Sequence, residues 1–502
     1  MSEDVSPLLR LLRSPWPLAL ALFIGSLALF TRDNTFSFDY HPDEDGKVYQ
    51  IIHRERNFHH PLLLLNVTDL AVHLAGVSLN SQPVVIVGRW VSAAFAAGAV
   101  VALALVAFLR AGSLAAWTVG LLAATHGKLY EAAHYLKEDT ALVFGLALFF
   151  LAAECFLRSP GERAVRFLGL ACAAAVGGKY VGLLVLPFAL VLVWCARKTT
   201  PTVQWRPFAT VFAVTFVVIN LPPTFHPSSP IRSLEREVVG VSAGHRGMTR
   251  GIPHAKYFPE LRDDVPLPLL AASGLALVML VATARRRSGA EWTLVLFPIV
   301  FFAMLSCSPK TAGRYLLPVT TLLCAIAGFG VIDLARLLSP IPSHFALGCV
   351  AIFLVNAQLP SLRTTIAEFQ KDDRIALAAW IAADVPADAI IAEDHRVNLV
   401  PPAIGDESGK PHVPQHVLDN DFAADLGTLD EMRSWGLVYV AVSQHTYDRF
   451  FSSSLKPRAS EKADYERRRE FYTRLFAEGE LVYELKSHGN PYLQPGLRLY
   501  KL

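Results

Sequence analysis

The sequence predicts a polytopic α-helical membrane protein that carries a soluble α/β domain at its C-terminal end. Of the 502 residues, 53% are hydrophobic and only 18% are charged, and the mean hydropathy is +0.38. These values lie outside the range of ordinary soluble domains. Apolar stretches of membrane length recur as far as residue 359, and hydropathy falls after that point. The net charge of +3 gives no overall field for nucleic acid, so we expect no nucleic-acid partner.

The apolar stretches define the membrane domain, residues 1–359. About eleven segments qualify or come close to the roughly 17 to 25 residues that a helix needs to cross the bilayer core. They cover residues 16–31, 84–109, 114–124, 140–157, 167–176, 180–195, 207–221, 267–282, 292–305, 315–335 and 345–359. We therefore expect about 11 transmembrane helices, although several of these segments are shorter than a full span.

Basic residues gather in every second short loop, which is typical of cytoplasmic loops. They are Arg10, Arg13, Arg110, Arg158, Arg163, Arg166, Arg197, Lys198, Arg206, Arg285, Arg286, Arg287 and Arg336. This pattern places the N-terminus in the cytoplasm and the alternate loops, together with residues 360–502, outside. The first apolar segment has no small-residue cleavage site, so it is expected to stay as an anchor.

Residues 360–502 have the composition of a separate soluble domain. Residues 374–386 show helical apolar spacing, and residues 461–480 predict a charged amphipathic helix. Short β-rich runs at residues 389–393, 437–443, 481–485 and 497–502 predict strands. Helices that alternate with strands favour a small α/β domain.

Acidic residues mark two outer loops. The stretch "HPDED" contains Asp43 and Glu44, Tyr49 follows, and "HHPLLL" begins ten residues later. In the next outer turn, Glu138 and Asp139 stand at the outer end of an apolar segment. A carboxylate at a membrane rim is costly unless it contacts water or has a function, so we expect one shared acidic cavity. The alternative is a solvated loop or a pair of helix caps.

In order along the chain, "HPDED", Tyr49, "HHPLLL", "GRWVSAAFAAG", "KEDTALVF", "GGKYVGLL" and "GRYLLPV" match a known arrangement. The sequence resembles the GT-C glycosyltransferases of the protein O-mannosyltransferase and aminoarabinose transferase type, which include dolichyl-phosphate-mannose-protein mannosyltransferases. The resemblance covers most of the chain and implies the GT-C fold. It also implies transfer of a sugar from a polyprenyl-phosphate donor to a protein, lipid or glycan acceptor, usually with inversion. We expect a multi-pass protein of the bacterial plasma (inner) membrane, in contact with membrane lipids.

The resemblance assigns roles to particular residues. Asp43 is the expected general base, Glu44 positions it or the acceptor, and Asp139 completes the acidic cavity. The residues expected to bind the donor phosphate or the substrates are Lys179, Lys310, Arg314, Tyr315, His245, Arg246, His60, Tyr49 and Glu138. For the basic residues at the ends of spans, contact with lipid headgroups is the alternative.

A metal ion and two other kinds of protein were also considered. His41, Asp43, Glu44, His59 and His60 include the ligand types of a divalent metal, but their spacing is not diagnostic. Because a lipid monophosphate leaving group requires less help from a metal than a nucleotide diphosphate, we expect that no metal is required. A bound divalent metal ion is the alternative. "YHPDED" also fits a glycolipid-building mannosyltransferase. A transporter or assembly protein is disfavoured because no inverted repeat is found and because paired outer carboxylates would not be needed.

Overall fold

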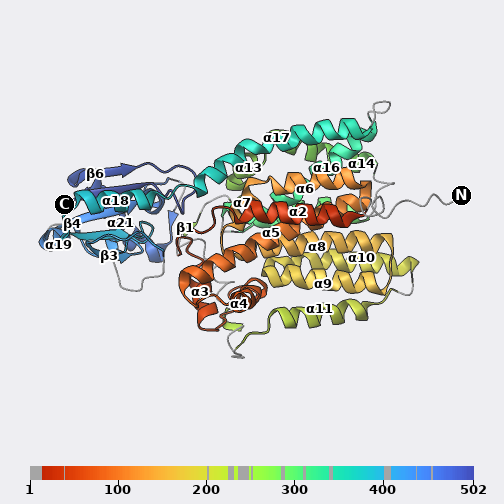
Figure 1. Cartoon of the computed structure of the whole chain (residues 1–502), viewed down its shortest axis with the longest axis horizontal. Coiled ribbons are helices and arrows are strands. Elements are labelled where there is room, and N and C mark those ends of the chain that lie inside the picture. The colour runs from red at the N-terminus through yellow and green to blue at the C-terminus, as the bar shows by residue number, and fades with distance from the viewer. Residues whose placement is uncertain are drawn as a thin grey trace.

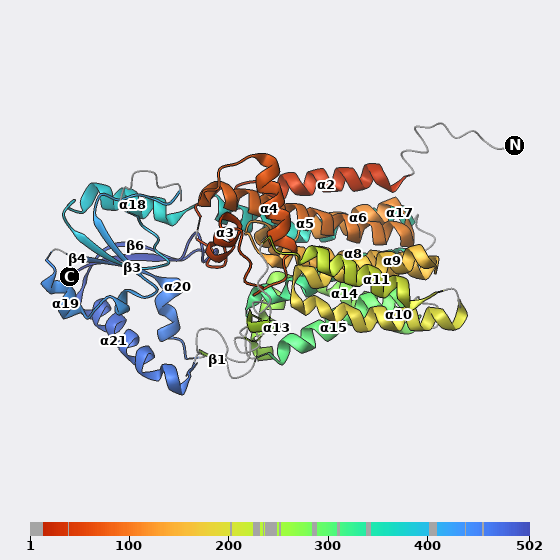
Figure 2. The same ribbon diagram turned by 90° about the horizontal axis from the view of Figure 1, so that it is seen from below.

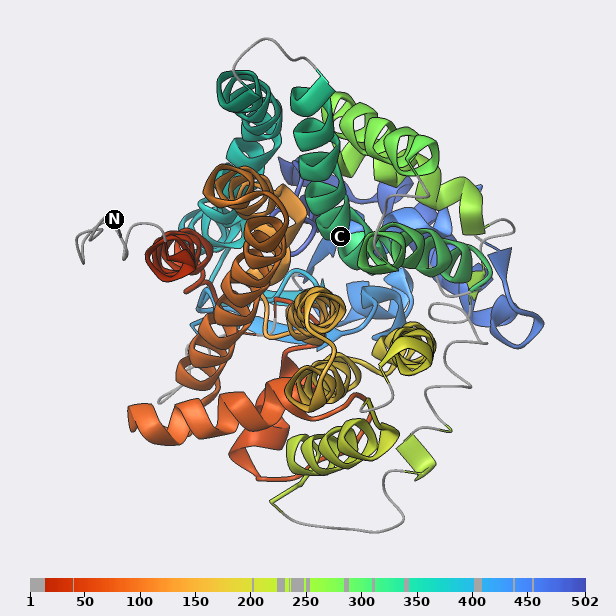
Figure 3. The same ribbon diagram turned by 90° about the vertical axis from the view of Figure 1, so that its right-hand side faces the viewer.

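A helical bundle and an α/β domain lie end to end in this computed structural model (Figure 1). The structure describes residues 14–38, 40–200, 203–223, 231–233, 235, 248–249, 253–283, 289–308, 312–337, 343–400, 409–436, 438–453 and 456–502. Figure 3 looks along the bundle, whose helices run roughly parallel to one another. The predicted residues Lys310, His245 and Arg246 lie outside the described residues.

All eleven predicted apolar segments are helical. They form α2 (Pro15–Thr31), α5 (Ser81–Ala111), α6 (Ser113–Ala124), α8 (Glu138–Arg158), α9 (Glu162–Gly178), η1 (Tyr180–Leu184) with α10 (Val185–Thr199), α11 (Trp205–Ile219), α14 (Leu267–Ala282), α15 (Gly289–Ser306), η3 (Gly313–Leu316) with α16 (Leu317–Leu337), and α17 (Ser343–Phe369). Their helical form follows from the need to satisfy each backbone polar group within the segment inside a bilayer.

The expected number of membrane spans is not confirmed. Within the described residues, five helices are long and apolar enough to cross a membrane, or six if one bent pair forms a single span. That pair is the end of α13 (Pro253–Asp264) and α14, bent by 106°. Helices such as α2, α6 and α11 are apolar but have 17 residues or fewer, which explains the difference from eleven.

Several short helices were not predicted, and three of them lie where the bundle meets the α/β domain. They are α3 (Asp45–Ile52), α4 (Leu63–Ala75) and α7 (Gly127–Ala133). In Figure 1, α4 is seen nearly end-on while the bundle helices run across the view, so α4 crosses the end of the bundle. Its Leu70 and Leu74 are exposed, as expected for a helix that rests at the membrane surface.

The C-terminal elements agree with the sequence. The predicted helices are α18 (Asp373–Asp384) and α21 (Lys462–Glu478), and the predicted strands are β2 (Ile390–Asp394), β4 (Val438–Ser443), β6 (Glu480–Leu485) and β7 (Leu497–Lys501). The sheet also contains β3 (His416–Asn420) and has the order β3-β2-β4-β7-β6. Strands β3, β2 and β4 are parallel, whereas β7 is antiparallel to both of its neighbours.

Among the contacts between the α/β domain and the bundle, two involve backbone elements. Helix α17 continues through Pro360 to Phe369, so the predicted boundary at residue 359 falls within a helix. A short antiparallel pair links β1 (Met248–Thr249) of an outer loop to β5 (Lys456–Pro457) of the domain. Figure 2 shows α3 between the domain and the bundle. The loop that follows α2 and contains α3 is therefore placed between these two parts of the molecule.

Candidate functional site

A cavity of about 470 Å³ opens where the loop that follows α2 meets the ends of the bundle helices. One part of its wall is apolar and comes from α8, η1, α15 and α16. The apolar lining includes Leu142, Val181, Phe301, Met304, Leu305 and Pro318. The polar lining includes Asp43, Lys47, His60, Lys137, Glu138, Asp139, Lys179, Arg314 and Tyr315. The cavity can therefore hold a ligand with an apolar chain and a polar head.

The first group of charges, which we name the loop cluster, consists of Asp43, Lys137 and Arg314. Asp43 lies just before α3, Lys137 is the N-cap of α8, and Arg314 lies in η3. Lys137 Nζ donates to Asp43 Oδ2, and Arg314 lies 3.5 Å from the same oxygen. Segments far apart in the sequence thus place two cations on one carboxylate.

The charges of the loop cluster determine how its members bind protons. Burial alone would raise the pKa of Asp43, but the cations Lys137, Lys47 and Arg314 together hold it well below its usual range. Burial, assisted by Arg314, lowers the pKa of Lys137 to about 8, although Asp43 opposes this. In this arrangement of charges, Asp43 is therefore ionised but weakly basic.

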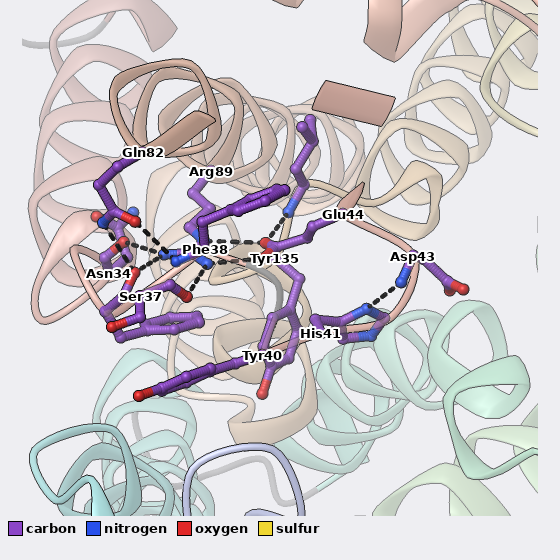
Figure 4. A network of polar contacts seen from close by, with 12 residues as sticks. Asn34, Ser37, Phe38, Tyr40, His41, Asp43, Glu44, Gln82, Arg89 and Tyr135 are labelled. Atoms are coloured by element: carbon purple, nitrogen blue, oxygen red, sulfur yellow. Dashed lines mark hydrogen bonds and ion pairs between the residues drawn. The ribbon is translucent and has the colours of Figure 1, made fainter. Parts of the chain in front are cut away.

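Glu44 points away from the cavity and is buried completely. Arg89 of α5 donates to both of its oxygens, at 2.9 and 2.6 Å, and the backbone N–H of Leu136 donates at 3.0 Å (Figure 4). Arg89 also donates to the carbonyl oxygens of Asn34, Phe36 and Ser37. This network ties the segment before α3 to α5 and to the turn before α8.

Two glycines of the predicted motifs allow close approaches around this network. A Cβ on Gly88, the residue before Arg89, would lie 2.6 Å from Leu136 Cδ1. A Cβ on Gly178, the residue before Lys179, would lie 2.6 Å from the backbone nitrogen of Leu142. A side chain at Gly178 would meet the backbone of α8 and push α9 away, whereas one at Gly88 would meet only the flexible end of the Leu136 side chain. Gly178 therefore helps to bring Lys179 to its partner.

The α/β domain contributes to the surroundings of Asp43 through His41. The backbone N–H of Asp43 donates to His41 Nδ1 at 3.2 Å. The His41 ring packs 4.4 Å from the Tyr492 ring and 4.6 Å from the Tyr135 ring, measured between centroids. Burial holds the pKa of His41 well below its usual value, so it is neutral. Asn490, from the same loop as Tyr492, donates to Tyr135 Oη at 2.9 Å.

The second group of charges, which we name the helix cluster, consists of Lys47, His60, Glu138, Asp139 and Lys179. Lys47 Nζ lies 3.3 Å from Glu138 Oε1, and Lys179 Nζ donates to Asp139 Oδ1 at 2.7 Å. His60 Nε2 is 4.0 Å from Glu138 Oε2. Burial lowers the pKa of His60 to about 3, so this ring is neutral at pH 7. The carboxylates also lie in the first turn of α8, where the helix dipole favours negative charge.

The structure brings most of the predicted residues together. Those that line the cavity are Asp43, His60, Glu138, Asp139, Lys179, Arg314 and Tyr315. The Tyr315 ring lies between two of the predicted cations, 5.3 Å from Lys179 Nζ and 5.6 Å from the Arg314 guanidinium. Tyr49 instead is exposed and stacks on His53, with ring centroids 4.0 Å apart. It does not line the cavity.

The metal-ligand types of the first loop are not gathered into one set. Within the described part of the chain, no group of three or more His, Cys, Asp or Glu side chains could hold a metal ion. Glu44 is turned toward Arg89, and His41 Nδ1 accepts from the backbone. The geometry therefore offers cations, rather than a ligand set, beside Asp43.

Sequence reasoning missed Lys137 and Lys47. Lys137 immediately precedes the predicted pair Glu138 and Asp139, so its place at the start of a span was a usable signal. Lys47 follows Asp43 by four residues, a spacing that places both near one face if a helix begins there. Lys47 lies in α3, and because this helix was not predicted, the residue was not recognised as part of the site.

Comparisons with known proteins support the fold. No protein-family model and no curated protein matches the chain. The crystal structure of ArnT from Cupriavidus metallidurans bound to undecaprenyl phosphate is 14% identical, with a TM-score of 0.57 and 97% of each chain covered. AglB, the archaeal oligosaccharyltransferase from Archaeoglobus fulgidus, solved with an inhibitory peptide and a dolichol-phosphate, is 11% identical. Its TM-score is 0.51, with 94% of this chain and 80% of that chain covered. The resemblance predicted from the sequence is thereby confirmed for the fold, and the chain has the GT-C fold that ArnT and AglB share.

Proposed function

We propose that this protein transfers a sugar from a polyprenyl-phosphate carrier to a hydroxyl group of a protein, lipid or glycan acceptor outside the membrane. The observation that carries the proposal is the cavity, in which an apolar wall adjoins a carboxylate with two cations. The fold is shared with ArnT and AglB, whose structures contain undecaprenyl phosphate and dolichol-phosphate. A lipid-linked phosphate has an apolar chain, which suits the apolar wall, and a negative charge, which suits the two cations.

In the proposed donor complex, the phosphate group binds between Lys137 and Arg314, and the prenyl chain follows the apolar wall. Charge-assisted hydrogen bonds from two cations suit a phosphate oxygen. Because the phosphate competes for both cations, Asp43 loses the contacts that depress its pKa and becomes a better base. Donor binding and activation of the base are therefore coupled.

The proposed reaction is a single displacement at the anomeric carbon. Asp43 takes the proton of the acceptor hydroxyl while the hydroxyl oxygen bonds to the anomeric carbon. The bond from that carbon to the phosphate oxygen breaks, and polyprenyl phosphate leaves with the additional negative charge. Lys137 and Arg314 stabilise this charge, so the proposal requires no metal ion. Attack opposite the phosphate inverts the anomeric centre.

A binding measurement tests the phosphate site. Arg314→Gln and Lys137→Gln should each weaken the binding of undecaprenyl phosphate by about 1.5 to 3 kcal/mol, the contribution of a hydrogen bond to a charged group. Wild-type affinity should fall above about pH 8, where Lys137 loses its proton. Lys137→Arg should abolish this fall because arginine stays charged.

Two results would contradict this assignment. Unchanged affinity in both glutamine variants would remove Lys137 and Arg314 from the phosphate site. A fall above pH 8 that persists in Lys137→Arg would place the titrating group elsewhere. Arg166→Gln is a matched control, because Arg166 pairs with Glu162 on the exposed surface of α9, outside the cavity.

The proposal also requires the α/β domain to lie outside the cell and the N-terminus inside, as the basic loops indicate. In a background without the six native cysteines, Ser460→Cys should react with a membrane-impermeant maleimide in intact cells. The comparison is Ser159→Cys in the basic loop after α8, which should react only after the membrane is opened. The reverse pattern would overturn the orientation.

A further inference from the structure

We propose that the helix cluster is the subsite for the transferred sugar and that this sugar is a neutral, hydroxyl-bearing hexose or pentose. The inference rests on the proposed function and extends it, because it divides the cavity between the two halves of the donor. The loop cluster receives the phosphate, and Lys47, His60, Glu138, Asp139 and Lys179 receive the sugar.

The first argument is the balance of charge among the described residues that line the cavity. The loop cluster has two cations, Lys137 and Arg314, against the single carboxylate of Asp43. One surplus positive charge matches the single negative charge of a phosphodiester. The helix cluster contains two ammonium groups and two carboxylates, and its histidine is neutral at pH 7. It therefore has no surplus charge with which to hold a phosphate.

The second argument is a pair of acceptor atoms that lack donors. Glu138 and Asp139 are 1% and 4% exposed, yet Glu138 Oε2 and Asp139 Oδ2 receive no hydrogen bond from the described residues. Leaving a buried charged acceptor without a donor is unfavourable. Both residues line the cavity, so a ligand there can supply the missing donors. Hydroxyl hydrogens of a sugar have the required chemistry.

The third argument is how the donors and acceptors are arranged. Each carboxylate has one oxygen held by a lysine and one oxygen without a donor among the described residues. A sugar hydroxyl both donates and accepts, so it can donate to the open oxygen and accept from the neighbouring ammonium. Two such pairs suit two or more hydroxyls of one ring. A sugar carboxylate would face Glu138 and Asp139 with like charge, and a sugar ammonium would add a third cation beside Lys47 and Lys179.

The test compares carriers that differ only in the group esterified to the phosphate. All carry the same charge except the 4-amino-arabinose carrier, whose ammonium adds one positive charge. The probes are polyprenyl methyl phosphate and polyprenyl phosphate esterified with mannose, glucose, arabinose or 4-amino-arabinose, each bound to the purified full-length protein. The wild type should bind at least one neutral-sugar carrier more tightly than the methyl ester. Glu138→Gln and Asp139→Asn should each weaken the binding of that carrier by about tenfold or more. They should weaken the binding of the methyl ester by less than about twofold. Glu131→Gln is the matched control, because Glu131 pairs with Lys128 on α7 outside the cavity.

Deoxy sugars provide a second readout, in which the loss of one hydroxyl is measured in the wild type and in Glu138→Gln. Removing the hydroxyl that bonds to Glu138 should weaken binding to the wild type by about tenfold and should cost little more in Glu138→Gln, because the two changes remove one contact. Equal losses for the sugar carrier and the methyl ester would overturn the proposal and assign the helix cluster to the phosphate. If the 4-amino-arabinose carrier binds more tightly than every neutral-sugar carrier, the assignment of a neutral sugar is overturned. A wild-type protein that binds none of these phosphodiesters would overturn the proposed function itself, and this subsite with it.

Discussion

Asp43→Asn is expected to lower turnover by roughly 10²- to 10⁴-fold, the usual contribution of a correctly placed general base. Donor affinity should be kept or should increase, because the substitution frees Lys137 and Arg314 from their carboxylate. The protein should still fold, since Asp43 is half-buried at the edge of the cavity and its side chain is not part of the Arg89 network. Single-turnover assays with a synthetic polyprenyl-phosphate sugar, together with donor-binding measurements, check both parts.

The control for this variant is Asp45→Asn. Asp45 is two residues away, is exposed, and lies in the first turn of α3 without lining the cavity. The Asp45→Asn variant should therefore retain the turnover of the wild type. If Asp43→Asn stays within about threefold of the wild type, Asp43 is not the base, since base catalysis contributes far more than that. Asp139 would then be the next carboxylate to test.

Arg89→Met is expected to destabilise the protein by about 3 to 5 kcal/mol, because it leaves Glu44 as an uncompensated charge in the interior. Both side chains of this ion pair are completely buried. The same change removes the hydrogen bonds to the carbonyl oxygens of Asn34 and Ser37. The segment that leads to Asp43 should loosen, so turnover should fall as well. Thermal unfolding of the purified protein in lipid nanodiscs measures the loss of stability.

A double variant separates the buried charge from a general loss of packing. Glu44→Met combined with Arg89→Met should be more stable than either single variant, since replacing a whole buried pair by apolar residues is far less costly than removing one partner. Arg166→Gln serves as control, because exposed pairs four residues apart on a helix contribute about 0.3 to 0.5 kcal/mol. An Arg89→Met protein with wild-type stability would show that the pair does not hold the first loop.

The sequence predicted the helices of the membrane domain well because their signal is local. A segment inside a bilayer must satisfy its own backbone groups, so an apolar run such as residues 84–109 can only be a helix there. Strands such as β4 and β7 were also predictable, since their β-branched and aromatic residues form short runs. Helices α3, α4 and α7 have mixed composition and short length, so no local pattern separated them from loops.

Within the site, the order of motifs was sufficient to group Asp43, Asp139, Lys179 and Arg314 on one side of the membrane. It was not sufficient to assign Asp43 and Glu44 their separate surroundings. Adjacent residues at the start of a helix point in different directions, and only the packing of α5 against the first loop turns Glu44 toward Arg89. No pattern in the sequence links Tyr492 to His41 either, since they are separated by most of the chain.

The sequence by itself determined the class of protein, the positions of its bundle helices and the end of the bundle at which its acidic residues gather. These features depend on hydropathy and charge along short stretches of chain, which act before any long-range contact forms. Tertiary structure alone decided which charges pair. Lys137 meets Asp43 and Lys179 meets Asp139 only after α8, α9 and the first loop have packed together. Because an electrostatic interaction depends on distance in space and on burial, partners 94 and 40 residues apart cannot be identified from spacing along the chain.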